Sequence, residues 1–234
     1  MRYRLPDDLS FCRVDDRLVF LDVLHDRYFL LPASQEQAFV AWLDHPESAG
    51  TDIALLLANK VLTEAPPSPG TMQTEPVCKP ERSVAERFPA AGAVQPAALL
   101  EVLSIVVLTR WQLKHRTLKQ VLGSMTRNRC ASPAPQLRDC DGVSDTISFD
   151  AAGVFAQARR YVPVEPTCLL DSIALARFLS RRHQPGSLVF GVTGAPFSAH
   201  CWIQVGTTVL NDTVGNVGAY TPIREVRWPA GTLR

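Results

Sequence analysis

The chain has 234 residues, 46% of them apolar and 20% charged, so it can bury a substantial core. Its formal net charge is +1 and it has no run of lysine or arginine, so composition does not indicate binding to nucleic acid or a membrane surface. The first residues lack the apolar stretch of a secretory signal. The longest apolar run, at 97–108, is shorter than the roughly 18 residues of a membrane span. We therefore expect a cytoplasmic protein without membrane insertion.

The six cysteines are predicted to be reduced thiols, because disulfide frameworks belong mainly to secreted chains. The sequence contains no C-x-x-C pair, and we predict neither a metal site nor a bound cofactor. It also contains no glycine-rich phosphate-binding motif, so it does not reveal whether the protein needs ATP. At most one of the six thiols needs a chemical role, and the others are predicted to be small buried side chains.

Residues 1–63 have the pattern of a small domain of their own. Three short strands joined by tight turns are predicted at 10–14, 17–24 and 27–31. A helix is predicted at 33–45, with Ser34 as its N-cap and Gln37 as the partner of that cap. A second helix is predicted at 51–62. The expected domain is a three-stranded sheet with two helices.

Seven prolines and little apolar periodicity between Glu64 and Pro96 predict an extended linker over residues 64–96. Residues 97–234 are predicted to form a second domain. Its expected elements are helices at 97–125, at 150–161 and from Pro166-Thr167 onward, then strands at 187–192, 199–205, 207–212 and 224–228. This order predicts an α+β fold in which a cysteine-bearing helix packs on an antiparallel sheet.

Cys168 lies in the first turn of that predicted helix, directly after Pro166-Thr167. Unpaired N–H groups and the dipole at a helix N-terminus stabilise a thiolate. The same N–H groups can stabilise the oxyanion of an acyl-transfer intermediate. A small buried cysteine that happens to begin a helix would give the same pattern. Taken alone, the pattern favours that structural interpretation.

A predicted hairpin further along the chain supplies an imidazole and a carboxylate. Alternation along AHCWIQV places His200 on one face and Cys201 on the other, so Cys201 is not expected to share a site with His200. If the hairpin is centred on Gly206 with a loop of odd length, His200 lies opposite Asp212 on the same face. A two-residue turn would place them on opposite faces unless a bulge intervened. A carboxylate beside an imidazole fixes its tautomer and stabilises its charged form. With Cys168, these residues are predicted to form a nucleophilic site.

These motifs resemble those of the transglutaminase-like cysteine proteases of lasso-peptide biosynthesis, the leader peptidases of microcin-type gene clusters. The resemblance covers the second domain and rests on PTCLLDSIALARFL, the FGV strand, FSAHCWIQ and LND. It implies that Cys168 is the nucleophile, His200 the base and Asp212 the orienting acid. The chain departs from the family pattern at Cys201, where alanine is usual. It departs again at Gln204, where glutamate is more common and where substrate contacts could change.

The first domain is similar to PqqD-like leader-recognition domains, which are small winged helix-turn-helix folds. This resemblance rests on RLVFLDVLHDRYFLL and DIALLLANKVLTEA. Such domains bind a leader peptide as an added strand, beside their third strand and against their last helix. The residues that this implies for leader binding are Tyr28, Phe29, Leu30, Ile53 and Leu57. A half-buried strand without a ligand would show the same pattern.

The whole chain resembles a fused maturation protease, a cysteine peptidase that removes the leader from a ribosomally made lasso-peptide precursor so that the core can be cyclised. The resemblance implies an ATP-dependent macrolactam synthetase as a partner. A linker that tethers the two domains would raise the effective concentration of the bound precursor. Two alternatives remain. The same three residues could acylate an amine, as in a transamidase or arylamine-type acyltransferase, or the protein could be a leader-binding scaffold with an idle triad.

Overall fold

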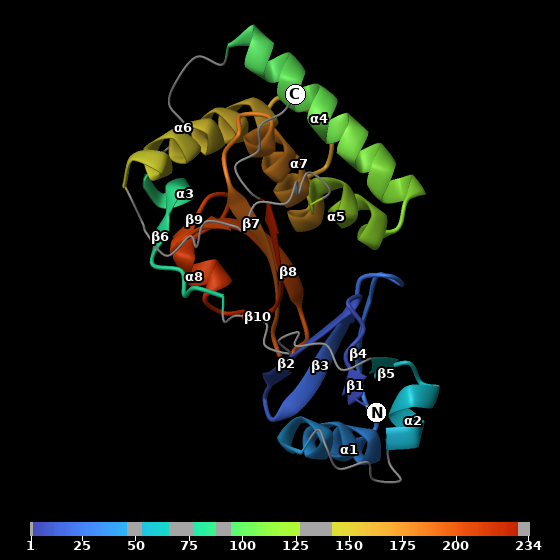
Figure 1. Cartoon of the computed structure of the whole chain (residues 1–234). Coiled ribbons are helices and arrows are strands. Elements are labelled where there is room, and N and C mark those ends of the chain that lie inside the picture. Colours follow the sequence, from blue (N-terminus) through green and yellow to red (C-terminus); the bar gives the residue numbers. More distant parts are fainter. Residues whose placement is uncertain (1, 46–52, 66–76, 88–94, 127–141, 229–234) are drawn as a thin grey trace. The chain divides into compact units, whose positions relative to one another are not determined.

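The computed structural model describes residues 2–45, 53–65, 77–87, 95–126 and 142–228. The chain divides into two units, Met1–Pro76 and Val77–Arg234 (Figure 1). Each unit has its own sheet and its own helices, and the sheets are mainly antiparallel. The fold is therefore a mixed α/β arrangement.

The first unit is built on an antiparallel sheet with the strand order β2-β3-β4. Its strands and helices are β2 (Leu9–Val14), β3 (Arg17–Asp22), β4 (Arg27–Leu30), α1 (Ala33–Asp44) and α2 (Ile53–Ala58). These confirm the three predicted strands and two predicted helices. The turns fall at Asp15, Asp16 and Asp26, which have positive φ, a conformation that aspartate tolerates better than most residues. A short ribbon of β1 (Arg2–Arg4) and β5 (Thr63–Ala65) was not predicted.

Aromatic rings form the core of the first unit. The rings of Phe20 and Phe39 are fully buried and meet edge to face, with their centroids 5.1 Å apart. Phe29 on β4 stacks on Phe20 at 5.2 Å. Because such pairs add to the stabilisation from buried area, the sheet and α1 are fixed together.

The start of α1 differs from the prediction. The N-cap position is Pro32, which makes no side-chain cap, so Ser34 lies inside the helix. Glu36 connects the helix to β3 instead, because its carboxylate accepts the Leu18 N–H at 2.6 Å and the Arg17 Nε at 2.8 Å. The first turn of α1 is thus held by a contact distant in sequence, which a local capping rule does not detect.

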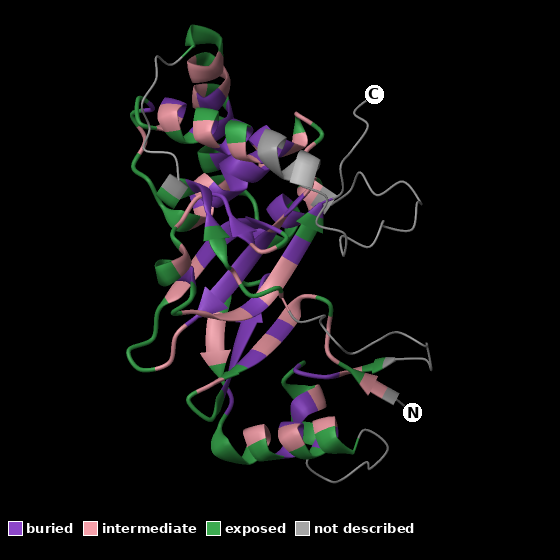
Figure 2. Ribbon diagram, turned by 90° about the vertical axis from the view of Figure 1, so that its left-hand side faces the viewer, coloured by how far each residue is buried: buried purple, intermediate pink, exposed green. Residues whose placement is uncertain are grey.

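The second unit contains a five-stranded sheet with the order β10-β7-β8-β9-β6. Its strands are β6 (Arg82–Ser83), β7 (Gly186–Val192), β8 (Ala199–Val205), β9 (Thr208–Val209) and β10 (Thr221–Trp228). Neighbouring strands are antiparallel except for β6 and β9. All four predicted strands are present, although β9 is shorter than predicted. The strands β7 and β8 are buried along most of their length (Figure 2).

Part of the predicted linker 64–96 belongs to this sheet. β6 pairs with β9 and leads into α3 (Val84–Arg87), and the side chains of Ser83 and Val84 are buried. The linker prediction is therefore wrong for this segment, because two paired residues are too few to show periodicity among prolines. The rest of the predicted linker lies mostly at 66–76 and 88–94, outside the described residues.

The helix α7 (Cys168–Ser180) is the centre of the second unit. It packs on β7 and β8 on one side and on α4 (Pro96–His115) and α6 (Gly142–Arg159) on the other (Figure 1). Its buried residues are Leu170, Ser172, Ile173, Ala174, Leu175, Ala176, Phe178 and Leu179. A helix buried on most of its circumference is fixed in rotation, so the residue at its start has a defined position.

The single helix predicted at 97–125 is two helices, α4 and α5 (Leu118–Thr126). A reciprocal capping box separates them. The Gln120 N–H donates to the Thr117 hydroxyl and the Thr117 N–H donates to the Gln120 carboxamide, both at 3.3 Å. The apolar pattern continues from α4 into α5 without interruption. For this reason the sequence predicted a single helix.

The helix α4 is long and apolar enough to cross a membrane by length and composition, and 28% of its apolar window is buried. Length and composition alone are weak evidence for a membrane span, because a mostly buried core helix passes the same test. In this structure α4 is joined to α7, because the Arg177 guanidinium donates to the Thr109 hydroxyl at 2.8 Å and to the Gln112 carboxamide. These bonds give α4 a packing role in the second unit.

Candidate active site

Cys168 is the first residue of α7 and its side chain is exposed. Thr167 is the N-cap, in an extended conformation, and its hydroxyl accepts the Leu170 N–H at 3.3 Å. The predicted helix start is therefore confirmed. The thiol lies at the positive end of the helix dipole, where a thiolate is stabilised.

His200 and Asp212 are in direct contact, as predicted. The imidazole Nε2 lies 2.5 Å from the Asp212 Oδ2, and both side chains are less than one-fifth exposed. Asp212 is held in turn by the Thr213 backbone N–H at 2.7 Å and by the Asn216 carboxamide at 2.8 Å. Three donors fix the carboxylate, so it can orient the imidazole ring.

The route to this contact differs from the prediction. β8 and β9 pair Val205 with Thr208, so the turn has two residues and Gly206 adopts a φ of +56°. The loop of odd length is therefore absent, and the structure has the two-residue turn, which brings the two side chains together only if the pairing is interrupted. Continued pairing in this register would place His200 and Asp212 on opposite faces.

An asparagine side chain ends the pairing and allows the contact. Leu210 donates its N–H to the Ile203 carbonyl at 2.9 Å, as in a regular ladder. The Ile203 N–H, however, donates to the Asn211 Oδ1 at 2.8 Å. The chain leaves the strand at this point, and Asp212 turns back toward His200.

The segment that was predicted to be linker also braces this turn. The Ser83 hydroxyl donates to the Asp212 backbone carbonyl at 2.5 Å, and the Glu86 carboxylate accepts the Val214 N–H at 3.1 Å. Both bonds hold the loop that carries the acid. β6 and α3 are therefore part of the scaffold of the site.

Cys201 also belongs to the site, contrary to the prediction. Its thiol hydrogen-bonds the Cys168 sulfur. Ser172 lies one helical turn after Cys168 and its hydroxyl donates to the Cys201 carbonyl at 3.0 Å, so this face of α7 meets β8 at residue 201. Strand alternation points the side chains of His200 and Cys201 in different directions. Both nevertheless form hydrogen bonds with the Cys168 sulfur at the start of α7.

The electrostatics of the site favour a thiolate and an imidazolium. Hydrogen bonds from the Cys201 thiol and from His200 lower the pKa of Cys168 from 9.0 to about 4. Hydrogen bonds to Asp212 and to Cys168 raise the pKa of His200 from 6.5 to about 9. Burial acts to raise the pKa of Asp212, but the bonds from His200 and its other donors outweigh burial and lower it. At neutral pH Cys168 is therefore ionised and His200 carries a proton.

Aromatic rings limit the space around the imidazole. The ring centroids of Tyr220 and Trp202 lie 5.1 and 6.2 Å from that of His200. Gly191 pairs with His200 across the sheet, and a Cβ there would lie 2.8 Å from both the Trp202 ring and the Tyr220 Cβ. Only glycine fits at this position without moving an aromatic wall of the site.

The sequence profile of the transglutaminase-like superfamily matches residues 105–225, just over half of the chain. The chain belongs to this superfamily. Over 45 residues it is also 47% identical to the microcin J25-processing protein McjB of Escherichia coli, a match that covers 19% of this chain and 22% of that relative's length. No solved structure matches the chain significantly.

Members of the transglutaminase-like superfamily are typically cysteine enzymes. Cys168, His200 and Asp212 bring together a thiol, an imidazole and a carboxylate, the groups that a nucleophile, a base and an orienting acid would supply in such chemistry. Among the described residues no group of three or more His, Cys, Asp and Glu side chains is placed to hold a metal ion.

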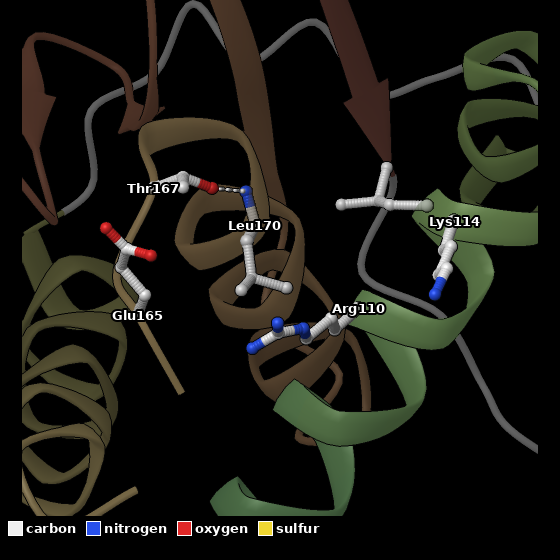
Figure 3. A pocket seen from close by; sticks show the side chains of 6 residues that line it. Arg110, Lys114, Glu165, Thr167 and Leu170 are labelled. Atoms are coloured by element: carbon white, nitrogen blue, oxygen red, sulfur yellow. Dashed lines mark hydrogen bonds between the residues drawn. The ribbon is translucent and has the colours of Figure 1, made fainter. Parts of the chain in front are cut away.

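A hollow lies beside the start of α7 (Figure 3). Arg110 and Lys114, one turn apart on α4, line one side of it. Glu165 and Thr167 line the other side, directly before the first residue of α7 in sequence. Neither cation forms an ion pair within the described part of the chain, so the hollow is lined by two cations and one carboxylate, that of Glu165.

Gln204 serves the fold and does not face substrate. It is buried, its Nε2 donates to the carbonyls of Cys78 and Gly206 at 2.7 Å, and its Oε1 accepts the Trp202 indole N–H at 3.0 Å. A carboxamide can donate two hydrogen bonds and accept one, whereas the ionised carboxylate of a glutamate could only accept. The change in substrate contacts that the sequence suggested at this position is therefore not supported.

The predicted leader-binding residues lie in the first unit and divide into two groups. Tyr28 and Phe29 are partly buried, whereas Leu30 is 52% exposed, and all three lie on β4, an edge strand of its sheet. Ile53 belongs to the buried core of this unit and Leu57 packs against that core. Ile53 is thus unsuited to bind a leader, because α2 turns this residue inward.

Besides Cys201 and the bracing residues Ser83 and Glu86, sequence reasoning missed other residues that shape the site, among them Ser172, Asn211, Asn216 and Tyr220. Ser172 could have been found from its i+4 spacing to Cys168. Asn211 precedes the predicted acid directly, and asparagine commonly ends strands by bonding to the backbone. Tyr220 carries no signal that a single sequence displays.

We expect Cys201→Ala to raise the pKa of the Cys168 thiol, because the thiolate loses a hydrogen-bond donor. A bond to a charged group is worth roughly 1.5–3 kcal/mol, or about 1–2 pKa units. The measurement is the rate of Cys168 alkylation by iodoacetamide as a function of pH. Cys12→Ala, in the first unit, is the matched control and should leave the profile unchanged. An unaltered profile in Cys201→Ala would remove Cys201 from the site.

Proposed function

We propose that this protein is a cysteine peptidase that removes the leader from a lasso-peptide precursor. The observation that carries the proposal is the contact of an ionised Cys168 with a protonated His200 that is oriented by Asp212. The partial match to a microcin-processing protein supports the choice of substrate class. The resemblance in sequence adds an ATP-dependent macrolactam synthetase as a partner, and both proteins would act in the cytoplasm.

The site residues suggest the order of the chemical steps. The Cys168 thiolate attacks the carbonyl at the junction of leader and core, and the N–H groups at the start of α7 stabilise the oxyanion. Nε2 of His200 is held by Asp212, so Nδ1 is the nitrogen available to protonate the leaving amine. Neutral His200 then deprotonates a water molecule that hydrolyses the thioester. This frees the N-terminal amine of the core, the group that a macrolactam synthetase would close into a ring.

The first unit is proposed to hold the leader in the manner of a PqqD-like domain. β4 is an edge strand, so its outer backbone groups are available to an added strand. Leu30 on β4 and Leu55 on α2 expose more than half of their side chains and would contact the leader. Leu55 replaces Ile53 in this proposal, because Ile53 lies in the core.

The peptidase proposal predicts that Cys168→Ala abolishes leader removal and that Asp212→Asn slows it by about 10²–10⁴-fold, the usual range for losing controlled proton transfer. The substrate is a precursor peptide encoded beside the gene for this protein, and the products are measured by mass spectrometry. Cys78→Ala, which changes an exposed thiol, is the control and should process normally.

Two results would contradict the peptidase proposal. Leader removal by Cys168→Ala at the normal rate would show that the thiol is not the nucleophile. Transfer of the acyl group to an added amine, without hydrolysis in its absence, would favour the transamidase alternative.

The leader-binding proposal predicts that Leu30→Glu or Leu55→Glu weakens leader binding about 10–100-fold, since burying a leucine is worth roughly 1.5–3 kcal/mol. Binding of a fluorescent leader peptide to the full chain is measured by anisotropy. Leu24→Glu, at an exposed leucine in the turn after β3, is the control. Processing should show a raised KM with little change in kcat. Equal leader affinity in all three variants would remove leader recognition from this surface.

A further inference from the structure

The active site contains two thiols with different surroundings. Cys168 is exposed, whereas Cys201 is 2% exposed and its S–H donates to the Cys168 sulfur. The Ser172 hydroxyl, fully buried, donates to the Cys201 carbonyl at 3.0 Å and accepts the Asn211 carboxamide N–H at 2.9 Å. These bonds hold residue 201 against the first turns of α7. The pair is therefore a fixed feature of the packing between helix and sheet.

We propose that Cys168 and Cys201 form a redox pair, in which peroxide oxidises Cys168 and Cys201 closes an internal disulfide that reversibly switches the site off. This inference rests on the proposed function only in taking Cys168 as the reactive thiol. It assigns a chemical role to Cys201 that leader removal does not require.

The oxidation proceeds in two balanced steps. The Cys168 thiolate attacks one oxygen of hydrogen peroxide, the O–O bond breaks, and the hydroxide leaving group takes the proton of imidazolium His200 to leave as water. Cys168 is then a neutral sulfenic acid. In the second step the Cys201 sulfur attacks that sulfenic sulfur, the S–O bond breaks, and the oxygen leaves as a second water with the thiol proton. Two thiols and one peroxide thus give one disulfide and two waters.

The environment of Cys201 suits it to the second step and not to the first. Its pKa is raised well above 9.0, first by the hydrogen bond to the Cys168 thiolate and then by burial. Cys201 is thus an uncharged thiol, shielded from peroxide, as long as Cys168 is ionised. Conversion of Cys168 to sulfenic acid removes the negative charge that opposes ionisation of Cys201. Its reactivity therefore rises only after the first step has occurred.

The other described thiols lack these properties. Cys12 is buried in the first unit, and burial raises its pKa to about 11. Cys78 is exposed, but its backbone carbonyl accepts a bond from Gln204 and no second described thiol contacts it. Oxidation by peroxide is thus directed to Cys168, where a partner is in contact.

The experiment treats the reduced full chain with a small excess of hydrogen peroxide at pH 8 and measures intact mass and peptide linkage. The wild-type protein should lose about 2 Da, with the peptides of Cys168 and Cys201 joined, and dithiothreitol should restore full alkylation of Cys168. Cys201→Ala should gain about 32 Da as sulfinic acid at Cys168, which dithiothreitol does not reverse. Cys78→Ala is the matched control and should behave as wild type.

Two results would overturn the redox pair. One is the absence of a Cys168–Cys201 linkage in oxidised wild-type protein, and the other is equal recovery of wild type and Cys201→Ala after reduction. Cys201→Ser keeps the size of the side chain and repeats the test if Cys201→Ala fails to fold. The experiment measures the mass and the thiol alkylation of the protein itself. Its result therefore does not depend on whether the protein is a peptidase. A protein that forms the disulfide but leaves the leader attached would refute only the proposed function.

Discussion

The hydrogen bond from the Ser172 hydroxyl to the Cys201 carbonyl is the contact on which the arrangement of the site depends. It joins the first turns of α7 to the strand that carries His200, and Asn211 binds the same hydroxyl. Losing one partner of a buried hydrogen bond costs about 1–3 kcal/mol. The larger effect would be geometric, because a displacement of about 1 Å between reacting groups can cost 10²-fold in rate. A buried serine with no direct chemical role thus sets the distance between nucleophile and base.

The electrostatics follow from this placement. A thiol at a helix start is moderately acidic by itself. Here two further groups donate to its sulfur. The imidazole among them is kept protonated by the Asp212 carboxylate, which two other donors hold in place. Each charge is compensated by a hydrogen-bonding neighbour, and the His200 and Asp212 side chains are less than one-fifth exposed, although Cys168 itself is exposed. Attack on a peptide carbonyl and protonation of a leaving amine both require this pair of charges.

The sequence predicted the site better than the path of the chain that forms it. The cysteine helix and the histidine strand follow from capping residues and strand alternation, which act locally. The contact with Asp212 was also predicted, but through a loop of odd length that the structure does not have. The hairpin register was predicted incorrectly, because a side-chain amide of Asn211 replaces a backbone group and ends the ladder. The role of Cys201 was missed for a related reason. Strand alternation tells which side chains share a face of the sheet. It does not tell where the first residue of the packed helix α7, Cys168, lies relative to those side chains.

Two other errors have the same origin in long-range packing. The two residues of β6 gain their structure from pairing with β9, more than a hundred residues later. Ile53 has an amphipathic context that suits a surface, but α2 is rotated so that this residue fills the core. In both cases the local pattern is as described, but the residues that pack against the segment are distant in sequence. A single sequence does not identify such distant packing partners.

The central claim is that Cys168 is a thiolate at neutral pH, and a titration of thiolate ultraviolet absorbance tests it most directly. The spectrum of Cys168→Ala is subtracted from that of the wild-type protein at each pH. Because the pKa of Cys168 is lowered to about 4, the difference should correspond to one thiolate per chain at pH 6 and should disappear as the pH falls through about 4. A difference that is absent at pH 6 and develops only toward the ordinary cysteine pKa of 9.0 would contradict this claim.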